Sequence, residues 1–331
     1  MNLSTRYLGL DLPHPLIAGA SPLADHINTV RELEDAGAAA IVLRSLFEEQ
    51  ITREQTSAFL NTEPHNESSA EALTYFPARQ SFAFGPEEYL NHLARVKAAV
   101  NIPVIASLNG STPGGWLDYA PLIESAGADA LELNVYRLAF DPSLSSQDVE
   151  REAVDIVREV RRTVRLPLSV KLSPFYSSLA HFAGELEQAG ASGLVLFNRF
   201  YQPDIDPEAL ELNRGLSLSD QRELPLRLRW LGALSSQVKA SLAVSGGIHD
   251  SRDAIKAVMA GAHAVQVVSA LLEKGPGHLS VLRQGMIDWM REFEWESLDS
   301  MRGNMNLKRC PNPAAYERAN YVQMLQGWRN R

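Results

Sequence analysis

Polar side chains that could bind a ligand recur where apolar segments of the chain end. Lys171 lies near the end of the segment PLSVKL, Arg44 follows AIVL, and Asn134 closes ALELN. A lysine within an apolar segment is costly to bury unless a polar or anionic group faces it. Lys171 therefore indicates either a cation beside a ligand that gains negative charge, such as the N1/O2 edge of a reduced flavin, or a lysine that extends to water.

Asparagines follow the same pattern at Asn109, Asn134 and Asn198, each at the end of an apolar segment. An amide carries both a donor and an acceptor, so three amides at neighbouring segment ends favour a planar ligand with donor and acceptor edges. A single asparagine would more simply be a turn residue. We assign Asn109 and Asn134 to a cofactor and Asn198 to a substrate.

A phosphate site is predicted near the end of the chain's repeating pattern. Gly246 and Gly247 follow the segment LAVS, and Val268 and Ser269 follow AVQV. Adjacent glycines expose backbone N–H groups, the helix that follows adds partial positive charge, and the Ser269 hydroxyl can donate to the same anion. A glycine pair alone would be only a turn.

The elements that position these residues follow from a repeated phrase, Ala-Gly-Ala, which occurs four times, centred on Gly37, Gly127, Gly190 and Gly261. Each copy ends an amphipathic stretch and precedes a β-rich segment, as a glycine just past a helix end should. The predicted strands span residues 16–20, 40–44, 103–108, 130–134, 167–172, 193–198, 242–245 and 264–268. The predicted helices span residues 27–36, 87–100, 148–164, 179–189 and 251–260, the last capped by Asp250 or Ser251. Repeated βα units of this length predict an α/β fold, a closed (β/α)8 TIM barrel whose chemistry lies at the carboxyl ends of the strands.

Residues 1–331 are expected to form a single domain, with the barrel over about 14–276 and a helical tail over 278–331. Two segments, 46–86 and 199–225, are too long for plain connections and start at strand carboxyl ends, where substrate loops occur; the alternative is insertions without a role. The tail aromatics are expected to pack a terminal helix onto the barrel or onto a partner subunit. They are Trp289, Trp295, Tyr316, Tyr321 and Trp328.

Composition excludes several classes of protein. The net charge of −9 argues against a nucleic-acid or anionic-membrane surface, and the single cysteine, Cys310, excludes an internal disulfide and a cysteine-ligated cluster. The histidines show no metal-ligand spacing, so no metal is expected. No signal peptide or membrane-spanning run is visible, and a cytoplasmic protein is expected.

Several segments resemble the dihydroorotate dehydrogenase family, the soluble class 1 enzymes in particular: YLGLDLPHPLIAGASP, LELNVYR, SVKLSPF, VLFN and VSGGIHDSRDAIKAVMAGAHAVQVVSALLEKGPG. The resemblance extends to about Pro276 and implies an FMN-binding (β/α)8 barrel that oxidises dihydroorotate to orotate, a CH–CH oxidation of pyrimidine biosynthesis. By this similarity Lys171 would hold the pyrimidine edge of the isoalloxazine ring. The remaining implied contacts are Ala20, Ser21 and Ser45 at the flavin, Gly246, Gly247, Val268 and Ser269 at its phosphate, and Asn134 and Asn198 at the flavin or orotate.

The sequence departs from the family where the substrate binds. The family's Ser-Cys-Pro-Asn sequence is replaced. Arg137 stands at the position of the cysteine that acts as the catalytic base in the family, and Ala139 stands at that of a substrate-binding asparagine. Arg44 replaces a lysine, and Arg199 replaces a hydroxyl residue. The family's asparagine-rich loop after the second strand has no counterpart in LNTEPHNESSAEALTYF. The flavin half of the pattern is therefore kept and the orotate half is rewritten.

An arginine cannot act as a base at neutral pH, because its pKa lies above about 12. Tyr136 is the nearest replacement, and a neighbouring cation would lower its pKa. Arg44, Arg137 and Arg199 are assigned to an anionic substrate, since an arginine can clamp a carboxylate; for Arg137 and Arg199 the alternative is a salt bridge within the rewritten loops.

The sequence thus predicts an FMN-dependent oxidoreductase of the dihydroorotate dehydrogenase type, with Tyr136 and Lys171 as catalytic residues and a small anionic substrate. Three alternatives stay open: a flavin oxidoreductase for another anion, a sugar-phosphate barrel without redox chemistry, and a protein that binds FMN without turnover. The electron acceptor could be fumarate, a nicotinamide reached through a partner, or another redox protein, and a homodimer is possible by analogy with the family.

Overall fold

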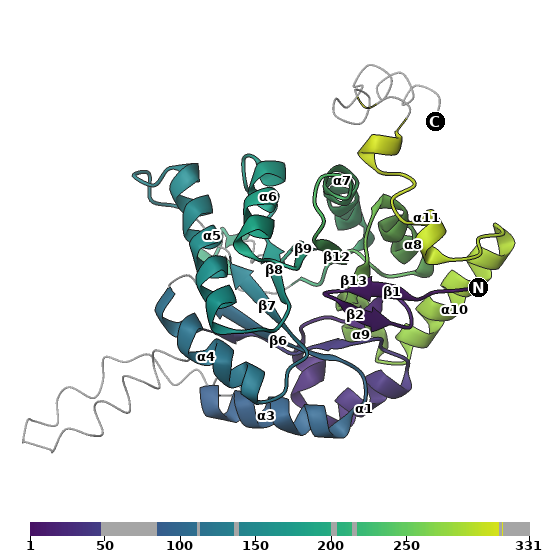
Figure 1. Cartoon of the computed structure of the whole chain (residues 1–331), viewed down its shortest axis with the longest axis horizontal. Helices are drawn as coiled ribbons and strands as arrows, with labels where there is room; N and C mark the ends of the chain where they lie inside the picture. The colour runs from purple at the N-terminus through teal and green to yellow at the C-terminus, as the bar shows by residue number, and fades with distance from the viewer. Residues whose placement is uncertain are drawn as a thin grey trace, which may run out of the picture.

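A closed ring of parallel strands forms the centre of the molecule, and helices surround it (Figure 1). The computed structural model describes residues 1–47, 85–110, 113–135, 139–199, 204–213 and 217–310, together with residue 313. Strand β4 pairs with β3 on one side and β6 on the other, which closes the sheet, and β5 continues the β4 strand along β6. The (β/α)8 barrel predicted from the sequence is confirmed. In chain order its strands are β3 Leu16–Ala18, β4 Ile41–Val42, β5 Leu46–Phe47, β6 Val104–Gly110, β7 Ala130–Val135, β8 Leu168–Leu172, β9 Gly193–Leu196, β12 Ser241–Ser245 and β13 Ala264–Val267.

The helices follow the strands in the expected alternation. They are α1 Ile27–Asp35, α3 Pro86–Ala99, α4 Pro113–Ser125, α5 Ser146–Thr163, α6 Leu179–Ala189, α7 Leu224–Leu234, α8 Ser251–Ala260, α9 Ser269–Lys274, α10 His278–Glu292 and α11 Leu298–Met301. Short 3-10 helices are η1 Pro22–Asp25, η3 Gln221–Glu223 and η4 Leu307–Arg309. The glycine of every Ala-Gly-Ala phrase has a positive φ, between 87° and 126°, which confirms the predicted helix-ending turns.

Local sequence explains where two of these helices begin. Asp250 caps α8 and accepts a hydrogen bond from the backbone N–H of Asp253, as the sequence predicted for this position. Ser145 caps α5 in the same way through the N–H of Asp148, and the Asp148 carboxylate accepts in return from the N–H of Ser145. Helix α5 then buries Val157 and Val160 against the barrel, so that capping and an apolar face together specify it.

The strands separate two apolar cores. Outward side chains such as Leu131 and Leu133 pack against the helices in the larger core. Inward side chains such as Ile17, Ile105 and Ala243 form a smaller core inside the barrel. Residues alternate between the two faces along each strand. An inward residue can therefore be polar while the residues before and after it are apolar and face the helices.

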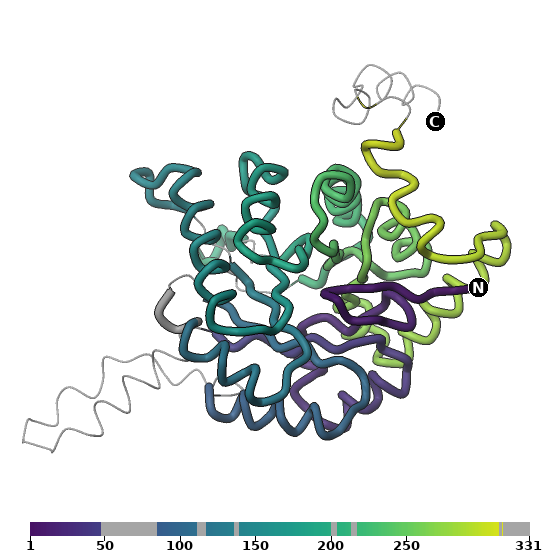
Figure 2. The backbone as a smooth tube through the Cα atoms, viewed as in Figure 1, coloured from purple at the N-terminus to yellow at the C-terminus, as the bar shows by residue number. Residues whose placement is uncertain are grey.

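A β-hairpin of β1 (Thr5–Tyr7) and β2 (Leu10–Leu12) belongs to the inner core, to which it contributes Tyr7, Leu8 and Leu12. This hairpin was not predicted from the sequence. The N-terminus lies beside the segment after α10 (Figure 2), where the N–H of Asn2 donates to the carbonyl of Glu296 at 2.9 Å. A second hairpin, β10 (Asp204–Asp206) with β11 (Glu211–Asn213), lies within the long segment after β9.

Part of the tail packs as expected. Trp289 and Trp295 are partly buried against the outer core, and the Trp289 ring lies 4.6 Å from that of Phe293. Tyr316, Tyr321 and Trp328 lie outside the described residues, as does most of the 46–86 segment. Within the part of the chain that the structure describes, no helix is both long and apolar enough to cross a membrane.

Candidate active site

The inner face of the barrel becomes polar toward the carboxyl ends of its strands. Ile105 on β6 and Ala130 on β7 pair in register within the inner core. Two residues further along, the inward positions are Ser107 and Glu132, which also pair, and Glu132 pairs in turn with Ser169 on β8. All three polar side chains are fully buried. The alternation of the strands therefore concentrates polar groups in the half of the barrel where (β/α)8 enzymes carry their chemistry.

Lys171 is held by two acceptors within this polar layer. Its Nζ lies 3.2 Å from Oε1 of Glu132 and 3.2 Å from Oε1 of Gln266, and the Gln266 amide donates to the other Glu132 oxygen at 2.6 Å. Lys171 is only 5% exposed, and both partners are fully buried. A buried ion pair is tolerated where further hydrogen bonds satisfy it, as Gln266 does here. Since an ammonium has three donors, one N–H of Lys171 is without a partner among the described residues.

Lys171 was predicted at the site from the sequence, whereas Glu132 and Gln266 were not. Both lie within short apolar strands, ALELNV and AVQV. The rule that singled out Lys171, a charged or polar group inside an apolar strand, applies equally to them. Applying it at every inward position would have found all three members of the network.

A second polar cluster joins Ser45, Ser107 and Asn134. The Asn134 amide donates to the Ser107 hydroxyl at 2.8 Å and to the Ser45 hydroxyl at 3.1 Å, and the two hydroxyls are 2.8 Å apart. Tyr89 of α3 fixes Ser107 from outside the strand, because its hydroxyl accepts from the Ser107 N–H and donates to the Ser107 carbonyl. Burial raises the pKa of the Tyr89 phenol, so it stays protonated and neutral. Ser45 and Asn134 were predicted at the site; Ser107 was not.

The glycine pair lies where helix α7 begins. Gly246 and Gly247 have φ values of 90° and 78°, which favour glycine. A Cβ on Gly246 would lie 2.7 Å from the Arg227 guanidinium, and one on Gly247 would lie 2.7 Å from the backbone nitrogen of Leu224. The positive φ therefore favours glycine at both positions, and the close approach of the α7 backbone requires it at Gly247, independently of any anion.

Ser219 connects the glycine pair to Ser269. The Ser219 hydroxyl accepts from the Gly247 N–H at 3.2 Å and lies 2.8 Å from the Ser269 hydroxyl, which accepts from the Ser219 N–H at 3.0 Å. His249 holds the segment, with its Nε2 2.6 Å from the Ser219 carbonyl oxygen. The structure thus brings Gly247 and Ser269 together, as predicted. No local pattern marks Ser219, which is 28 residues from Gly247 and 50 from Ser269 in the chain.

Two of the three predicted substrate arginines, Arg44 and Arg199, lie within the described residues, and both are engaged in ion pairs. Arg44 lies 3.1 Å from Asp25, whose carboxyl pKa is raised by burial and lowered in part by Arg44. Arg199 lies 2.6 Å from Glu223, which also pairs with Arg227 at 3.0 Å. For Arg199 this is the salt bridge that the sequence analysis kept as its alternative.

The other predicted residues either lie on or directly after a barrel strand or lie outside the described residues. Asn109 lies on β6 beside Asn134 of β7, and the Asn198 side chain accepts from the N–H of Arg199 just beyond β9. Ala20 and Ser21 follow β3, and Ser21 is buried at the start of η1. Val268 is the residue before α9, with its Cγ2 2.6 Å from where a Cβ on Gly19 would lie. Tyr136 and Arg137 lie outside the described residues. Across the described ranges, no three His, Cys, Asp or Glu side chains are grouped so that they could hold a metal ion.

Comparison with known proteins gives a consistent result. The family model described as dihydroorotate dehydrogenase matches residues 83–290. A protein of Methanothermobacter thermautotrophicus named dihydroorotate dehydrogenase B (NAD(+)), catalytic subunit, is 26% identical over 91% of this chain and 97% of its own length. Proteins of the same name from Thermoplasma volcanium and Thermoplasma acidophilum are 27% and 28% identical, each over 91% of this chain and 98% of its own length.

Proposed function

The chain belongs to the dihydroorotate dehydrogenase family, and we propose that it is an FMN-dependent oxidoreductase that removes hydrogen across a CH–CH bond of a small anionic substrate. The observation that carries this proposal is the Lys171–Glu132–Gln266 network. It holds a buried cation, with one N–H free among the described residues, at the ligand-binding end of the barrel. The relatives' names assign dihydroorotate oxidation to those proteins, which makes dihydroorotate the first substrate to test here.

The residues present fit FMN at two separated places. The free N–H of Lys171 and the Ser45–Ser107–Asn134 cluster supply donors and acceptors for a polar ring edge. The Gly247 N–H and the Ser269 hydroxyl, now satisfied by Ser219, supply donors suited to a phosphate. When bound, FMN supplies the two-electron chemistry by accepting a hydride.

Lys171 would stabilise negative charge that develops on the ring edge. A fixed cation in a water-poor site acts strongly on developing charge, because little solvent competes with it. Glu132 and Gln266 position the ammonium and keep it from reorienting. Gly246, Gly247, Val268 and Ser269 would hold the phosphate, with the Ser219 hydroxyl giving way or joining as a further ligand. Ala20, Ser21 and Asn109 would border the cofactor, and Asn198, with Arg44, Arg137 and Arg199, the substrate.

Tyr136 is proposed as the base that removes the second hydrogen as a proton. It directly follows β7, whose Asn134 lies in the serine–asparagine cluster, and Arg137 beside it would favour the phenolate. Replacement of Tyr136 by Phe should lower the rate of substrate oxidation about a hundredfold and remove the fall in rate at low pH that protonation of the base causes. The check is single-turnover reduction followed across pH. Unchanged rates would remove Tyr136 from the mechanism.

Another anionic substrate is the second candidate, and Ala139 favours it. This residue stands where the family pattern has a substrate-binding asparagine, and in the structure it is exposed at the start of the segment leading to α5. An alanine side chain offers no hydrogen bond to a dihydropyrimidine. A site built without that bond discriminates less strongly in favour of dihydroorotate.

The electron acceptor is proposed to be external to the chain, because the single cysteine excludes a cysteine-ligated redox cluster. The relatives named as catalytic subunits support an acceptor reached through a partner protein; a small acceptor such as fumarate is the other possibility. A homodimer is also proposed.

The proposed function is tested by an assay for orotate formation from dihydroorotate, with FMN present and an artificial dye as acceptor. Orotate formed in proportion to enzyme supports dihydroorotate as the substrate. Dye reduction by another carboxylic acid but not by dihydroorotate would favour the second candidate. No dye reduction with any substrate of this class, despite bound flavin, would contradict the proposed activity.

A further inference from the structure

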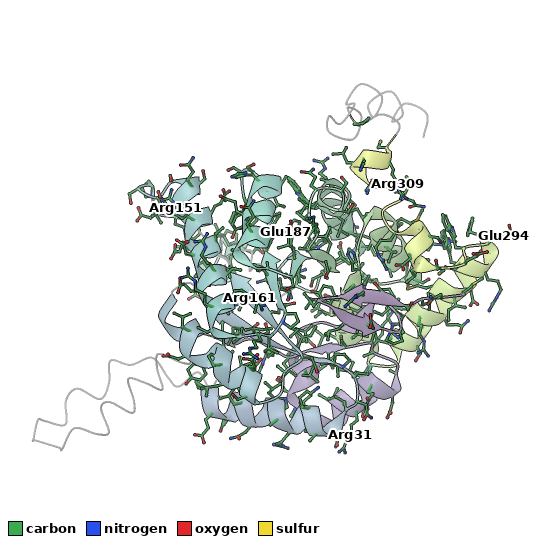
Figure 3. The ribbon with its side chains drawn as sticks, in the orientation of Figure 1. Arg31, Arg151, Arg161, Glu187, Glu294 and Arg309 are labelled. Carbon is green, nitrogen blue, oxygen red and sulfur yellow. The ribbon has the colours of Figure 1, made fainter. Side chains whose placement is uncertain are left out.

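A hollow of about 360 Å3 lies beside the barrel mouth, outside the two polar clusters described above. The segment before α5 and the first turns of that helix form one wall, with Phe140, Val149 and Ala139, so the hollow adjoins the position that the family pattern assigns to the substrate. The connection from β8 to α6 forms the other, with Ser173, Phe175 and Tyr176. A cavity of this size accommodates a small organic molecule. Arg151, labelled in Figure 3, marks the same end of α5 and lines the adjoining groove toward α6.

Glu150 of α5 lines both the hollow and the adjoining groove. Glu150 is only 8% exposed, and its Oε1 is buried without a hydrogen-bond partner among the described residues. Burial raises the pKa of this carboxyl, the charge of Glu185 on α6 raises it further, and His181 acts in the opposite direction. A buried carboxylate oxygen without a donor is unfavourable unless another molecule supplies one.

Three aromatic side chains line the hollow together with serines and small apolar residues, and two of the aromatic rings are unusually exposed. Phe140 is 84% exposed and Phe175 is 65% exposed, although phenylalanine is normally buried. Tyr176 packs on Phe182 of α6 with ring centroids 4.2 Å apart, which fixes the inner wall. Aromatic faces attract organic cations as well as apolar rings. Three aromatic side chains together with a carboxyl group that has one unpaired oxygen favour a cation with a flat apolar body.

We propose that this hollow is a second ligand site, which takes a small aromatic cation and pairs its N–H groups with Glu150. The site is next to the polar layer of the barrel. The Tyr176 hydroxyl donates to the carbonyl of Val135, the residue after Asn134, at 3.4 Å, and Ser173 is two residues beyond Lys171. A ligand here contacts the segments that end β7 and β8. The proposal does not depend on the identity of the redox substrate.

The probe is benzamidine, a flat ring that carries a bidentate N–H cation. Binding to the full-length protein is measured by isothermal titration calorimetry, with benzoate as the probe of opposite charge. We expect saturable binding of benzamidine and none of benzoate. Replacement of Glu150 by Gln should weaken benzamidine at least about tenfold, since the amide oxygen still accepts a hydrogen bond but no longer carries the charge that strengthens it.

The matched control is Glu159→Gln, the same substitution on the same helix at an exposed residue that pairs with Arg162. It should bind benzamidine as the unmodified protein does. Phe175→Ala provides a second variant at the surface, which should also weaken binding even if Glu150→Gln impairs folding. Absence of saturable benzamidine binding, equal binding of benzoate, or unchanged affinity in both Glu150→Gln and Phe175→Ala would overturn the proposal.

Discussion

The two halves of the barrel interior share one backbone pattern and differ in the side chains it carries. In the lower half, toward the amino ends of the strands, the inward residues are apolar and include Ile105, Ala130 and Ala243. In the upper half, the next inward positions include Glu132, Lys171 and Gln266, which are buried and joined by hydrogen bonds. The fold therefore requires only that inward and outward residues alternate along each strand. The residue types at the inward positions decide whether a level of the barrel contributes to stability or to chemistry.

The hairpin of β1 and β2 sharpens this contrast. It adds the fully buried Tyr7 to the lower half. Burial raises the pKa of the Tyr7 phenol, and the negative charge of Glu132 raises it further, so this hydroxyl stays neutral. The charge of the upper layer therefore affects the lower half. Tyr7 nevertheless stays uncharged, as expected of a residue in the apolar packing of the lower half.

Lys171→Met should produce the largest effect, because it removes the cation of the upper half and preserves side-chain volume. Substrate oxidation should fall about a thousandfold, as when a preorganised charge is lost. Stability should fall by about 3 kcal/mol, because Glu132 stays buried without its cation. Stopped-flow reduction and urea unfolding measure the two effects.

The control for this variant is the double replacement Lys171→Met with Glu132→Gln. It should recover most of the stability and none of the activity, because no unpaired charge is left. A Lys171→Met protein that oxidises substrate at the unmodified rate would contradict the role assigned to the upper half.

Ile105→Ala should show the reverse behaviour in the lower half. Removal of a side chain that is 1% exposed leaves a cavity and should cost about 3 kcal/mol in free energy of unfolding. Its kcat should stay near the unmodified value. Chemical denaturation and steady-state kinetics test this, with Ser107→Ala at the next inward position of β6 as the comparison. A loss of kcat without loss of stability in Ile105→Ala would break the division between the halves.

His14 makes the lower end of the barrel sensitive to acid. Burial, with the nearby Arg283 charge, lowers its pKa from 6.5 to about 4. Below pH 6.5 the unfolded chain takes up a proton that the folded chain does not, so stability falls as the pH decreases toward 4. The loss from this residue should be roughly 2 kcal/mol between pH 6.5 and 5.

His14→Gln should remove that contribution, because glutamine does not titrate and can still accept from the Leu16 N–H. Urea unfolding at several pH values measures the difference in slope. Parallel pH profiles for the two proteins would show that His14 is not the group responsible.

Ser269→Ala should have the smallest effect, on FMN affinity. Loss of one hydroxyl donor to a phosphate should weaken FMN about tenfold. Fluorescence titration of FMN into protein stripped of flavin measures this, with Ser280→Ala as the control because that hydroxyl bonds instead to the carbonyl of Ala36. Equal weakening in both variants, or in neither, would contradict the proposed phosphate site.

The fold was predictable because its signals are local. Each Ala-Gly-Ala phrase marks a helix end, and the glycines have the positive φ that such an end requires. The apolar segments predicted every barrel strand except β5 to within a few residues, and β5 lies in the segment that was expected to be a loop. The β1–β2 hairpin was missed because Thr5–Leu12 is short and its burial depends on the barrel that it contacts.

The candidate site was predictable only in part, because partners distant in the chain decide it. Lys171 and Asn134 were found at strand ends, whereas Gln266 is 95 residues from Lys171 and Ser219 is 50 from Ser269. Arg199 illustrates the converse: its residue type indicated an anion, and its pairing with Glu223 depends on a segment that only the folded chain brings near. Tyr136 stays a prediction.

The most direct test of the account is the visible spectrum of the purified protein under anaerobic conditions, before and after addition of dihydroorotate. The account predicts flavin bands that bleach on addition. Bands that stay unchanged would contradict dihydroorotate as the substrate. Absence of flavin bands, even after incubation with FMN, would contradict the central claim that the upper half of this barrel is a flavin site.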